Sequence, residues 1–495
     1  MQNTTPTTIP NKIQLMTYPD SLGGNLINLK STLDKYLKNS IGFVHILPPY
    51  PSSADRGFAP LTHLQIETKF GSWQDIVAIS SDYGLMLDVI AGHVSVKSEY
   101  FQDYLKNGEK SKYYEMFMRV EKTFVDGNIK IEELTNFSYL TPIPPLILFK
   151  LENGESKLHF KTFMPEQADL DVNSLIAREV LESFIQNHAK MGVKMVRLDA
   201  IETVCKDRKL GYHLVPQTFE VLEWIIGVIK SNGMEVLCEV FGTEELKTRI
   251  VQMGAWIYDF NLPDVIIHSV LSQKSQHLKT WFARPNTERT LTVLTNHDGF
   301  MVGRITENLT SEEVLFTRTQ MLENAGGLTQ KASGLNSNNI ATDGINATLM
   351  EVLFRDQEKW LICHILHLFA PGIPQMYYND VLGEINDLKA YEETGEGRSL
   401  IRHNFEMEDL AHVFARPVVA KLVKIMEFRN NYKAFLGEIK IMDSNENSLN
   451  LVWECGEFKT ELNIDLFHYQ FTIKYWDILD QEMKIWSVES VISFE

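Results

Sequence analysis

Eight short apolar segments recur along most of the chain, and helical patterns separate them. The segments are residues 13–18, 43–48, 85–90, 194–199, 235–240, 255–260, 291–298 and 372–378. Continuous runs rich in β-branched residues indicate strands that are covered on both faces. Amphipathic helical patterns lie between them, for example at 25–37 and at 219–233, where Gly233 is typical of a helix C-cap. This alternation predicts an α/β fold, namely a (β/α)8 TIM barrel.

Two connections between the predicted strands are too long for simple crossovers. Residues 95–170, with a hairpin pattern at 147–160, are interpreted as an inserted domain, and residues 301–350 as a long active-site loop region. Long connections in a compact domain tend to be functional. Alternating apolar and polar residues near the C-terminus predict an antiparallel β domain. The interpretation divides the chain into 1–94, 95–170, 171–300, 301–350, 351–434 and 435–495, with the barrel in the first, third and fifth parts.

Charge and composition restrict the partners. The chain has 47 basic and 65 acidic residues and a net charge of −18. This argues against nucleic acid or an anionic membrane as a partner, because both require a basic face. An apolar run of about 18 residues, long enough to span a membrane, is missing. The sequence therefore predicts a protein whose partners are small molecules.

The N-terminal segment and the cysteines bear on the compartment. Residues 1–12 are polar and lack the apolar stretch of a signal peptide. The four cysteines follow neither a metal-binding nor a disulfide spacing, so free thiols are expected; they are Cys205, Cys238, Cys363 and Cys455. These observations favour a cytoplasmic protein. A nicotinamide or P-loop glycine motif is not found, so no cofactor is expected. The oligomeric state stays open, with a homodimer among the alternatives.

Three of the predicted strands deliver an acid at their C-terminal ends: Asp199 in VRLDA, Glu239 in CEV and Asp298 in NHD. Side chains at these ends converge on one pocket of a barrel, so the carboxylates should differ in proton affinity. Arg197 shares a strand face with Asp199, and His297 precedes Asp298. Retaining glycosyl transfer needs two such carboxyl groups about 5–5.5 Å apart. Two alternatives stay open: the acids only end strands or cap helices, or they bind Mg²⁺ or Mn²⁺.

The same motifs resemble the signature regions of the α-amylase superfamily of (β/α)8 enzymes. Further segments resemble the sucrose phosphorylase subfamily; they are residues 15–26, 45–63, 70–76, 371–378 and 383–403. The resemblance implies a retaining glycosyltransferase of the disaccharide phosphorylase type. Such an enzyme moves glucose from sucrose, or from a related small α-glucoside such as glucosylglycerol, to phosphate. Asp199 would be the nucleophile that forms a covalent glucosyl-enzyme, Glu239 the acid/base, and Asp298 a ligand of glucose hydroxyls.

The resemblance also implies a pocket closed around one glucosyl unit. Asp55 and Arg402 would bind its far hydroxyls, and an ion pair between them is compatible with that role. The other implied pocket residues are His93, Phe163, Gln167, Arg197 and His297. Phe163 would be an aromatic platform and Gln167 a polar contact. Neither a cofactor nor a metal ion is implied, and the partners are an α-glucoside and phosphate.

The acceptor side departs from the subfamily pattern. Asp343 and Gly344 stand where the subfamily has a Tyr and a Gln that contact phosphate or fructose, and 136–146 lacks a clear counterpart of its phosphate-binding Arg. Phosphate is a dianion that Arg side chains or backbone amides usually hold. Another cation, such as Lys331 or Arg304, would have to replace the missing one.

Other positions differ as well. Phe241 follows the acid strand where a His is usual, Gly92 replaces an Asn, and Glu202 and Thr203 replace a small and an aromatic residue. We therefore expect a phosphorylase or transglucosidase with an unusual aglycone. The alternatives are a hydrolase or transglucosidase that uses water or a polyol, and a sugar-binding protein on a barrel that has lost its activity.

Overall fold

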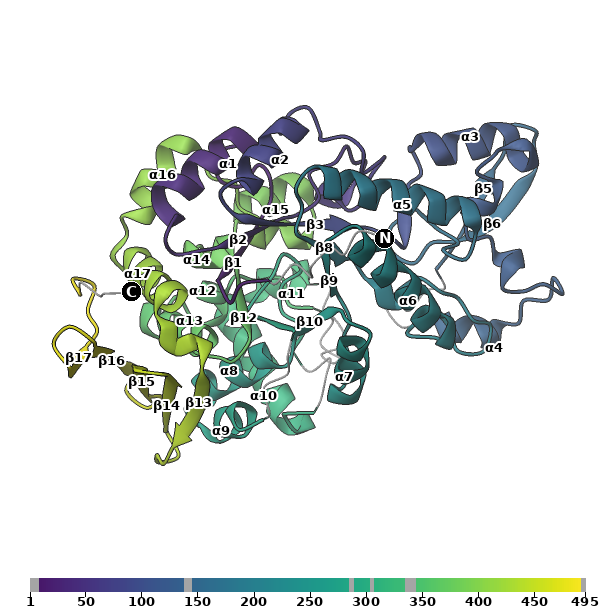
Figure 1. The fold of residues 1–495 in the computed structure, drawn as a ribbon. Helices are drawn as coiled ribbons and strands as arrows, with labels where there is room; N and C mark the ends of the chain where they lie inside the picture. The colour runs from purple at the N-terminus through teal and green to yellow at the C-terminus, as the bar shows by residue number, and fades with distance from the viewer. Residues whose placement is uncertain (1–8, 138–144, 285–288, 303–306, 334–343, 491–495) are drawn as a thin grey trace.

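A closed barrel of eight parallel strands forms the centre of the molecule (Figure 1). The computed structural model describes residues 9–137, 145–284, 289–302, 307–333 and 344–490. The barrel strands, in chain order, are β1 (Gln14–Thr17), β2 (Phe43–Ile46), β3 (Gly84–Val89), β8 (Met195–Leu198), β9 (Glu235–Cys238), β10 (Trp256–Asp259), β11 (Thr290–Val293) and β12 (Ile373–Tyr377). Each overlaps one predicted apolar segment, so the predicted (β/α)8 barrel is confirmed.

Several strands end earlier than the apolar pattern suggests. The segment 291–298 was predicted as strand throughout, but β11 ends at Val293. Beyond it, the Asn296 side chain accepts a hydrogen bond from the backbone N–H of Asp298 at 2.8 Å. Such local side-chain bonds compete with strand pairing. Asp298 therefore lies in a turn beyond the end of β11. Asp199 and Glu239, in contrast, directly follow the last residues of β8 and β9.

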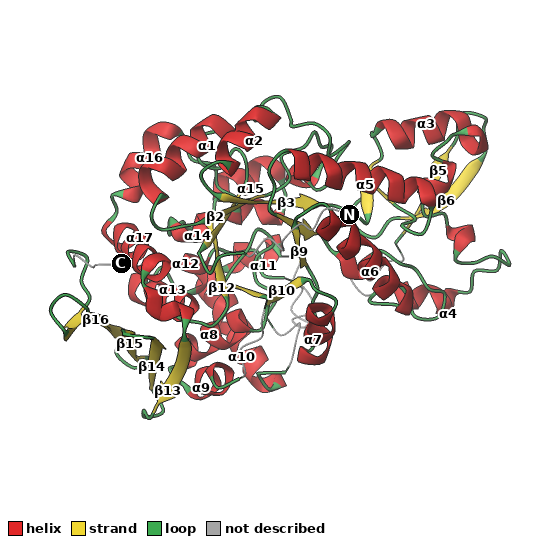
Figure 2. Cartoon of the chain, in the orientation of Figure 1, coloured by secondary structure: helices red, strands yellow, loops and turns green. Residues whose placement is uncertain are grey.

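Helices cover the outside of the barrel (Figure 2). They are α1 (Leu26–Thr32), α2 (Trp73–Ser80), α5 (Leu175–Lys190), α6 (Pro216–Ser231), α7 (Glu244–Gln252), α8 (Leu262–Ser272), α9 (Gln276–Phe282), α10 (Ser311–Ala325), α13 (Gln357–Leu368) and α17 (Pro417–Asn431). The predicted helix at 219–233 starts earlier, because Pro216 occupies its first turn, where a missing N–H costs nothing. Gly233 follows its end with φ +77°, as a C-terminal glycine should. The predicted helix at 25–37 changes to a π-helical turn after Thr32.

Shorter helices belong to the connections. They are α3 (Glu99–Asn107), α4 (Ile131–Leu134), α11 (Gly327–Ala332), α12 (Leu349–Val352), α14 (Tyr378–Val381), α15 (Leu388–Thr394) and α16 (Met407–Phe414). Of these, α11 lies with α10 in the region 301–350, which is therefore partly helical. Thr310 caps α10, because its side chain accepts a hydrogen bond from the backbone N–H of Glu313.

The barrel interior is apolar near the strand starts and polar near the strand ends. Its apolar layer includes Phe43, Met86, Met195, Leu237 and Ile373, all at most 4% exposed. Two positions further along, the same strands lead to His45, Asp88, Arg197, Glu239 and Gln375, which are also buried. Side chains two residues apart in a strand share a face. The alternation therefore fills the floor of the barrel and gathers charge at its mouth.

The segment between β3 and β8 projects from one side of the barrel (Figure 1). Its base is the antiparallel pair β4 (His93–Ser95) and β7 (Gln167–Asp169). The predicted hairpin at 147–160 is present as β5 (Leu146–Lys150) and β6 (Ser156–Phe160). A separate apolar cluster holds this segment together; it comprises Met118, Val120, Phe124, Phe137, Phe160 and Tyr212.

The C-terminal residues form a five-stranded antiparallel sheet, as predicted. Its strands are β13 (Glu438–Met442), β14 (Ser448–Cys455), β15 (Phe458–Asp465), β16 (Gln470–Asp477) and β17 (Glu482–Ile485). The exact limits assigned to the domains from the sequence stay a prediction. The four cysteines are free; Cys205, Cys238 and Cys363 are buried, and Cys455 is half-buried. Within the described residues, every helix is too short or too polar to cross a membrane.

Candidate active site

Arg197 connects the carboxylates at the barrel mouth. Its Nη1 atom lies 3.0 Å from Oδ1 of Asp199, and its Nη2 atom lies 2.6 Å from Oε1 of Glu239. Nη1 also pairs with Asp88, which in turn lies 2.8 Å from Nε2 of His45. The guanidinium is buried, so these ion pairs are weakly screened by solvent. Strand alternation on β3 and β8 therefore brings one cation into contact with three acids.

The backbone after Asp199 holds the other oxygen of Glu239. Ala200 has φ +42°, in the left-handed region that residues other than glycine rarely adopt. Its N–H donates a hydrogen bond to Oε2 of Glu239 at 2.8 Å. Strained backbone of this kind concentrates at functional sites. Both oxygens of Glu239 thus have a donor, one from Arg197 and one from the turn that follows Asp199.

Two of the three carboxylates hold their protons more tightly than the third. Burial raises the pKa of Asp199 to about 7, although Arg197 opposes the rise. Burial likewise raises the pKa of Glu239 to about 8, again against Arg197. Burial also acts on Asp298, but Arg398, His297 and Arg402 outweigh it and hold its pKa well below the ordinary value. Asp298 is therefore anionic at neutral pH, whereas the pKa values of Asp199 and Glu239 are both raised.

A second group of charged residues belongs to the barrel mouth besides Arg197 and its carboxylates. Asp55 lies 3.4 Å from Nη1 of Arg398 and 3.3 Å from Nη1 of Arg402. Asp298 lies 3.2 Å from Arg398 and 3.6 Å from Arg402. The predicted Asp55–Arg402 ion pair is present, and Arg398 joins it. Asp55 has φ +48°, so its turn is strained as well. Two arginines and two carboxylates thus form one network, which we call the Asp55–Asp298 network.

Aromatic rings and one carbonyl group link the remaining predicted residues. The Phe58 ring stacks on His297 with centroids 4.9 Å apart. The Phe58 carbonyl accepts hydrogen bonds from Nε2 of His93 at 2.7 Å and from Nε2 of Gln167 at 2.9 Å. Oε1 of Gln167 accepts from the N–H of Met164, so both ends of this buried amide are used within the protein. The geometry favours a positioning role for Gln167, while direct contact with a ligand stays a prediction.

Phe163 lies beside His93, with ring centroids 5.5 Å apart and planes inclined at 60°. Its half-buried ring is therefore at the edge of the same aromatic group. All ten predicted site residues come together at the C-terminal side of the barrel, directly or through shared neighbours. Their functional roles stay predictions.

Two of the residues that depart from the subfamily pattern, Glu202 and Phe241, contact each other. Oε2 of Glu202 accepts a hydrogen bond from the N–H of Phe241 at 2.7 Å. Nε2 of His213 lies 3.6 Å from the same oxygen. The Phe241 ring stacks on Phe260 with centroids 4.3 Å apart. Glu202 and Phe241 are therefore held in place by neighbouring side chains, close to Glu239 in the chain.

The other candidates on the acceptor side are less connected. Thr203 is buried and donates from its hydroxyl to the carbonyl oxygen of Ala200 at 3.0 Å. A Cβ atom at Gly92 would meet Val204 at 3.4 Å, an ordinary contact. Lys331 is exposed on α11. Arg304, Asp343 and most of 136–146 lie outside the described residues, so their predicted roles are not addressed.

Three contributors were missed from the sequence: Asp88, Arg398 and Phe58. Asp88 had a signal, because it is an acid inside the apolar run LMLDVI. Arg398 lies on the 3₁₀ segment Gly397–Ile401 and Arg402 follows that segment directly, so one short turn presents both side chains. The Phe58 carbonyl had no signal, because any residue carries one.

The fold and the site define the class of the protein. The family model described as "Alpha amylase, catalytic domain" matches residues 2–325. The chain therefore belongs to the α-amylase family.

Relatives that match almost the whole chain narrow the assignment. Sucrose 6(F)-phosphate phosphorylase of Thermoanaerobacterium thermosaccharolyticum is 37% identical, with 96% of this chain and 99% of that protein covered. Glucosylglycerol phosphorylase of Marinobacter adhaerens is 31% identical, with 95% and 98% covered. Sucrose phosphorylase of Streptococcus mutans is 31% identical, with 94% and 98% covered. The chain thus falls in the sucrose phosphorylase subfamily, as its motifs predicted.

A solved structure agrees with this assignment. The crystal structure of sucrose 6F-phosphate phosphorylase from Thermoanaerobacter thermosaccharolyticum matches with a TM-score of 0.92 and 35% identity. The match covers 98% of this chain and 99% of that chain. The likeness therefore includes the inserted segment and the C-terminal sheet as well as the barrel.

Proposed function

We propose that this protein is a retaining α-glucoside phosphorylase, a hexosyltransferase that moves glucose from a small α-glucoside to phosphate. The observation that carries the proposal is the guanidinium of Arg197, which contacts both Asp199 and Glu239. One cation shared by two buried carboxyl groups allows them to work in different protonation states. The relatives, which are named as phosphorylases of small glucosides, support the same reaction class.

In the first step, an oxygen of Asp199 bonds to the anomeric carbon while the bond from that carbon to the aglycone oxygen breaks. Glu239 passes its proton to the departing oxygen. The raised pKa of Glu239, about 8 through burial, favours this acid role at neutral pH. Once ionised, Glu239 is stabilised by the Arg197 guanidinium and by the N–H of Ala200.

In the second step, a phosphate oxygen bonds to the anomeric carbon and the bond to Asp199 breaks. The ionised Glu239 accepts a proton from the incoming phosphate. Two inversions at the same carbon retain the α configuration, so the product is α-glucose 1-phosphate. Arg197 then neutralises the released carboxylate of Asp199.

The Asp55–Asp298 network supports recognition of the glucosyl unit. Its charged groups can bind hydroxyls on the far side of a sugar, since charge-assisted hydrogen bonds are among the stronger ones. Nearby, Oη of Tyr18 and Nδ1 of His297 are buried without a hydrogen-bond partner among the described residues. Buried polar atoms are nearly always satisfied. A ligand rich in hydroxyl groups is the kind of partner that fits such a site.

The aglycone is small and polar in this proposal. The relative with 37% identity acts, by its name, on sucrose 6(F)-phosphate, and that with 31% on glucosylglycerol. Fructose 6-phosphate, fructose and glycerol are therefore the first acceptors to test. Transfer to water or to a polyol is the second candidate, because Glu202 and Phe241, which depart from the subfamily pattern, change the residues near Glu239.

Synthesis from α-glucose 1-phosphate tests the proposal directly. The protein is incubated with this donor and with fructose, fructose 6-phosphate, glycerol, glycerate or water alone, and phosphate release is recorded. Release that depends on one acceptor is expected, and that acceptor identifies the aglycone. The Asp199→Asn variant, which cannot form the glucosyl-enzyme, serves as the control and should release nothing.

Equal release in every tube, water included, would instead establish a hydrolase. Absence of release with the whole panel, together with absence of turnover of phosphate-free α-glucosides, would contradict both candidates and favour a sugar-binding protein.

The four free cysteines fit the reducing environment of the cytoplasm, which we propose as the location. Whether the protein forms a homodimer stays a prediction.

A further inference from the structure

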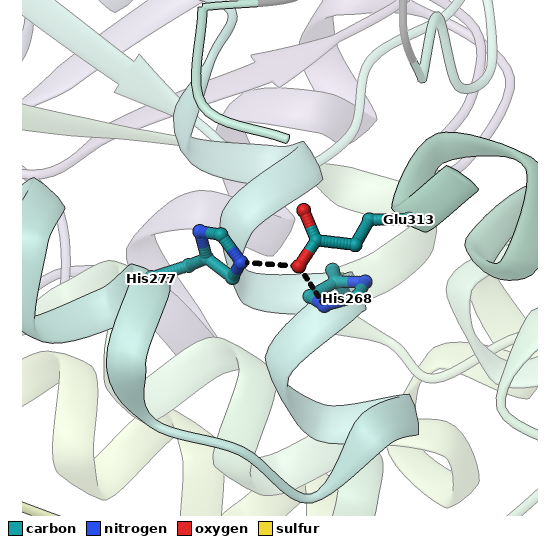
Figure 3. A group of neighbouring side chains, drawn as sticks. All are labelled: His268, His277 and Glu313. Atoms are coloured by element: carbon teal, nitrogen blue, oxygen red, sulfur yellow. Dashed lines mark hydrogen bonds and ion pairs between the residues drawn. The ribbon is translucent and has the colours of Figure 1, made fainter. Parts of the chain in front are cut away.

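Two histidines and one glutamate meet on three helices outside the barrel (Figure 3). His268 comes from α8, His277 from α9 and Glu313 from α10. One potential ligand atom from each residue lies within 4.8 Å of the other two. Among the described residues, this is the group of histidine, cysteine and carboxylate side chains whose spacing suits a metal ion. The glycosyl-transfer chemistry proposed above does not use it.

Thr317 determines which nitrogen of His268 is free. The Thr317 hydroxyl donates its hydrogen to the carbonyl oxygen of Glu313 at 2.8 Å. Its oxygen, 2.8 Å from Nδ1 of His268, must therefore accept, and Nδ1 must carry the proton. Nε2 is therefore the nitrogen of His268 that remains to bind a ligand, and it faces the carboxylate of Glu313.

Both histidines direct a ring nitrogen at the same carboxylate oxygen. Nε2 of His268 is 4.0 Å from Oε1 of Glu313, too far for a hydrogen bond. Oε1 also lies 2.8 Å from Nε2 of His277, with which it shares a hydrogen bond. A bound cation would replace that single hydrogen bond by coordination from all three atoms.

Glu313 is oriented for a single ligand oxygen. Its Oε2 atom accepts hydrogen bonds from the N–H and the hydroxyl of Thr310 at 2.8 and 3.0 Å. Oε2 is thus occupied, and Oε1 is directed at the histidines. Hydrogen bonds that orient ligands in this way are typical of metal sites.

We infer that His268, His277 and Glu313 bind a divalent transition-metal ion such as Zn²⁺. Two imidazole nitrogens and one carboxylate oxygen suit Zn²⁺ and its neighbours, whereas Ca²⁺ and Mg²⁺ prefer oxygen ligands only. Ligand atoms around tetrahedral Zn²⁺ lie about 3.3 Å apart. The two separations that involve Glu313, 2.8 and 4.0 Å, bracket that value, and the three atoms all lie within 4.8 Å of one another. His277 and Glu313 are a quarter to a third exposed, which leaves room for a water ligand.

The site would fasten the start of α10 to the C-terminal sheet. The turn between α8 and α9 is already bonded to that sheet, because the N–H of Ser275 donates to the carbonyl of Glu446 and Asn447 donates to the carbonyl of Gln273. A metal on His268, His277 and Glu313 adds α10 to this connection. Since α10 follows the turn that carries Asp298, the ion would stabilise the frame of the active site and take no part in the reaction.

Metal binding to the purified full chain tests the inference. After chelator treatment and dialysis, the protein is titrated with Zn²⁺ by calorimetry, and thermal unfolding is followed with and without the ion. One Zn²⁺ per chain and a raised unfolding temperature are expected. His277→Ala and Glu313→Gln should lose both effects. Thr317→Val keeps all three ligands but releases His268, so its affinity should fall about 10- to 100-fold.

The matched control is His468→Ala. His468 also pairs with a carboxylate, Asp465, at 2.8 Å, but lies on the surface of the C-terminal sheet. This variant should bind Zn²⁺ as the unaltered protein does. Unfolding temperatures that equal that of the metal-free unaltered protein would show that the variants are folded. If His277→Ala and Glu313→Gln do not fold, the Zn²⁺ affinity of Thr317→Val decides the outcome. Absence of binding in the unaltered protein, an equal response to Mg²⁺, or full affinity in Thr317→Val would overturn the inference.

Discussion

Among single residues, Arg197 influences the chemistry most, because its guanidinium contacts three carboxylates at once. It is 1% exposed, and removal of one partner from a buried ion pair is costly. Asp88 compensates part of its charge from inside the barrel, which leaves the two remaining contacts for Asp199 and Glu239. The protonation states of Asp199 and Glu239 therefore depend on the charged groups around them.

Glu239→Gln removes the proposed acid/base and leaves the proposed nucleophile. With a natural α-glucoside, we expect kcat to fall by about 10²- to 10⁴-fold, the usual contribution of general acid–base catalysis. With α-glucosyl fluoride, whose leaving group needs no proton, the first step should persist and a glucosyl adduct on Asp199 should accumulate. Intact-protein mass spectrometry detects the adduct. Asp199→Asn is the control and should carry no adduct. If Glu239→Gln carries none either, the proposed roles are contradicted.

The pH profile follows from the same pair. Asp199 is effective only after it loses its proton, near pH 7, and Glu239 only while it keeps its own, up to about pH 8. The value of kcat/KM should thus rise through about pH 7 and fall through about pH 8. These limits belong to the interacting pair. In Glu239→Gln with α-glucosyl fluoride, the fall at alkaline pH should vanish and the rise should remain. An unchanged alkaline limb would mean that another group titrates there.

Arg398→Ala tests the network that includes a residue not predicted from the sequence. The side chain is 41% exposed, so the variant should fold, yet Asp55 and Asp298 each lose one cation. A charged hydrogen bond contributes about 1.5–3 kcal/mol, so kcat/KM for the glucosyl donor should fall about 10- to 100-fold. Arg355→Ala, which removes the exposed ion pair with Glu351, is the control and should leave kcat/KM unchanged. Equal effects in both variants would contradict a role of Arg398 in binding.

At the scale of elements, the positions of the acids depend on where strands and helices end. β11 stops at Val293, so Asp298 is presented by a turn, and α10 begins soon after it at Ser311. The start of α10 rests on a capping box in which Thr310 and Glu313 bond to each other's backbone. This cap is therefore a local element that supports the loop above the barrel.

Thr310→Ala should loosen the first turn of α10. Loss of an N-cap side chain costs about 1 kcal/mol. Amide hydrogen exchange in the first turn should accordingly accelerate about five-fold, which peptide-resolved mass spectrometry can measure. Thr248→Ala is the matched control, because Thr248 lies inside α7 and bonds only to the carbonyl of Glu244. Unchanged exchange at the start of α10 would show that the cap is dispensable.

At the scale of the whole molecule, the C-terminal sheet is attached to the barrel through buried aromatic residues. Trp453 of β14 is 3% exposed and donates its indole N–H to the carbonyl of Phe369 at 2.9 Å. The hydroxyl of Tyr432, which follows α17, donates to the carbonyl of Trp476 at 2.7 Å and lies 3.2 Å from that of Lys459. Because Phe369 follows α13 directly, the sheet braces the helix that leads into β12.

Trp453→Ala should open this interface. Truncation of a buried Trp costs about 3–5 kcal/mol, so the unfolding temperature should drop markedly, while kcat/KM at 25 °C, well below unfolding, changes little. Phe467→Ala, at an exposed position of the same sheet, is the control and should be nearly neutral. Differential scanning calorimetry and initial rates measure the two quantities. A loss of activity without a loss of stability would indicate direct coupling between the sheet and the active site.

Local sequence patterns predicted the eight strands and the class of fold, and they singled out the three acids. Hydrophobic period, β-branched runs and helix caps are encoded locally, which is why Asp199 and Glu239 could be placed at strand ends without a structure, whereas Asp298 lies in a turn beyond β11. The ends of the strands were less certain, because turns such as that of Asn296 depend on single side-chain bonds.

Which charged groups pair with one another depends on the tertiary fold. Asp88 and Arg197 lie 109 residues apart, and Arg398 and Asp55 lie 343 residues apart. Closure of the barrel brings such pairs together, and the direction of each side chain then selects its partner. The His268–His277–Glu313 group likewise depends on how three separate helices pack. Long-range convergence of this kind is set by packing, and local sequence patterns do not record it.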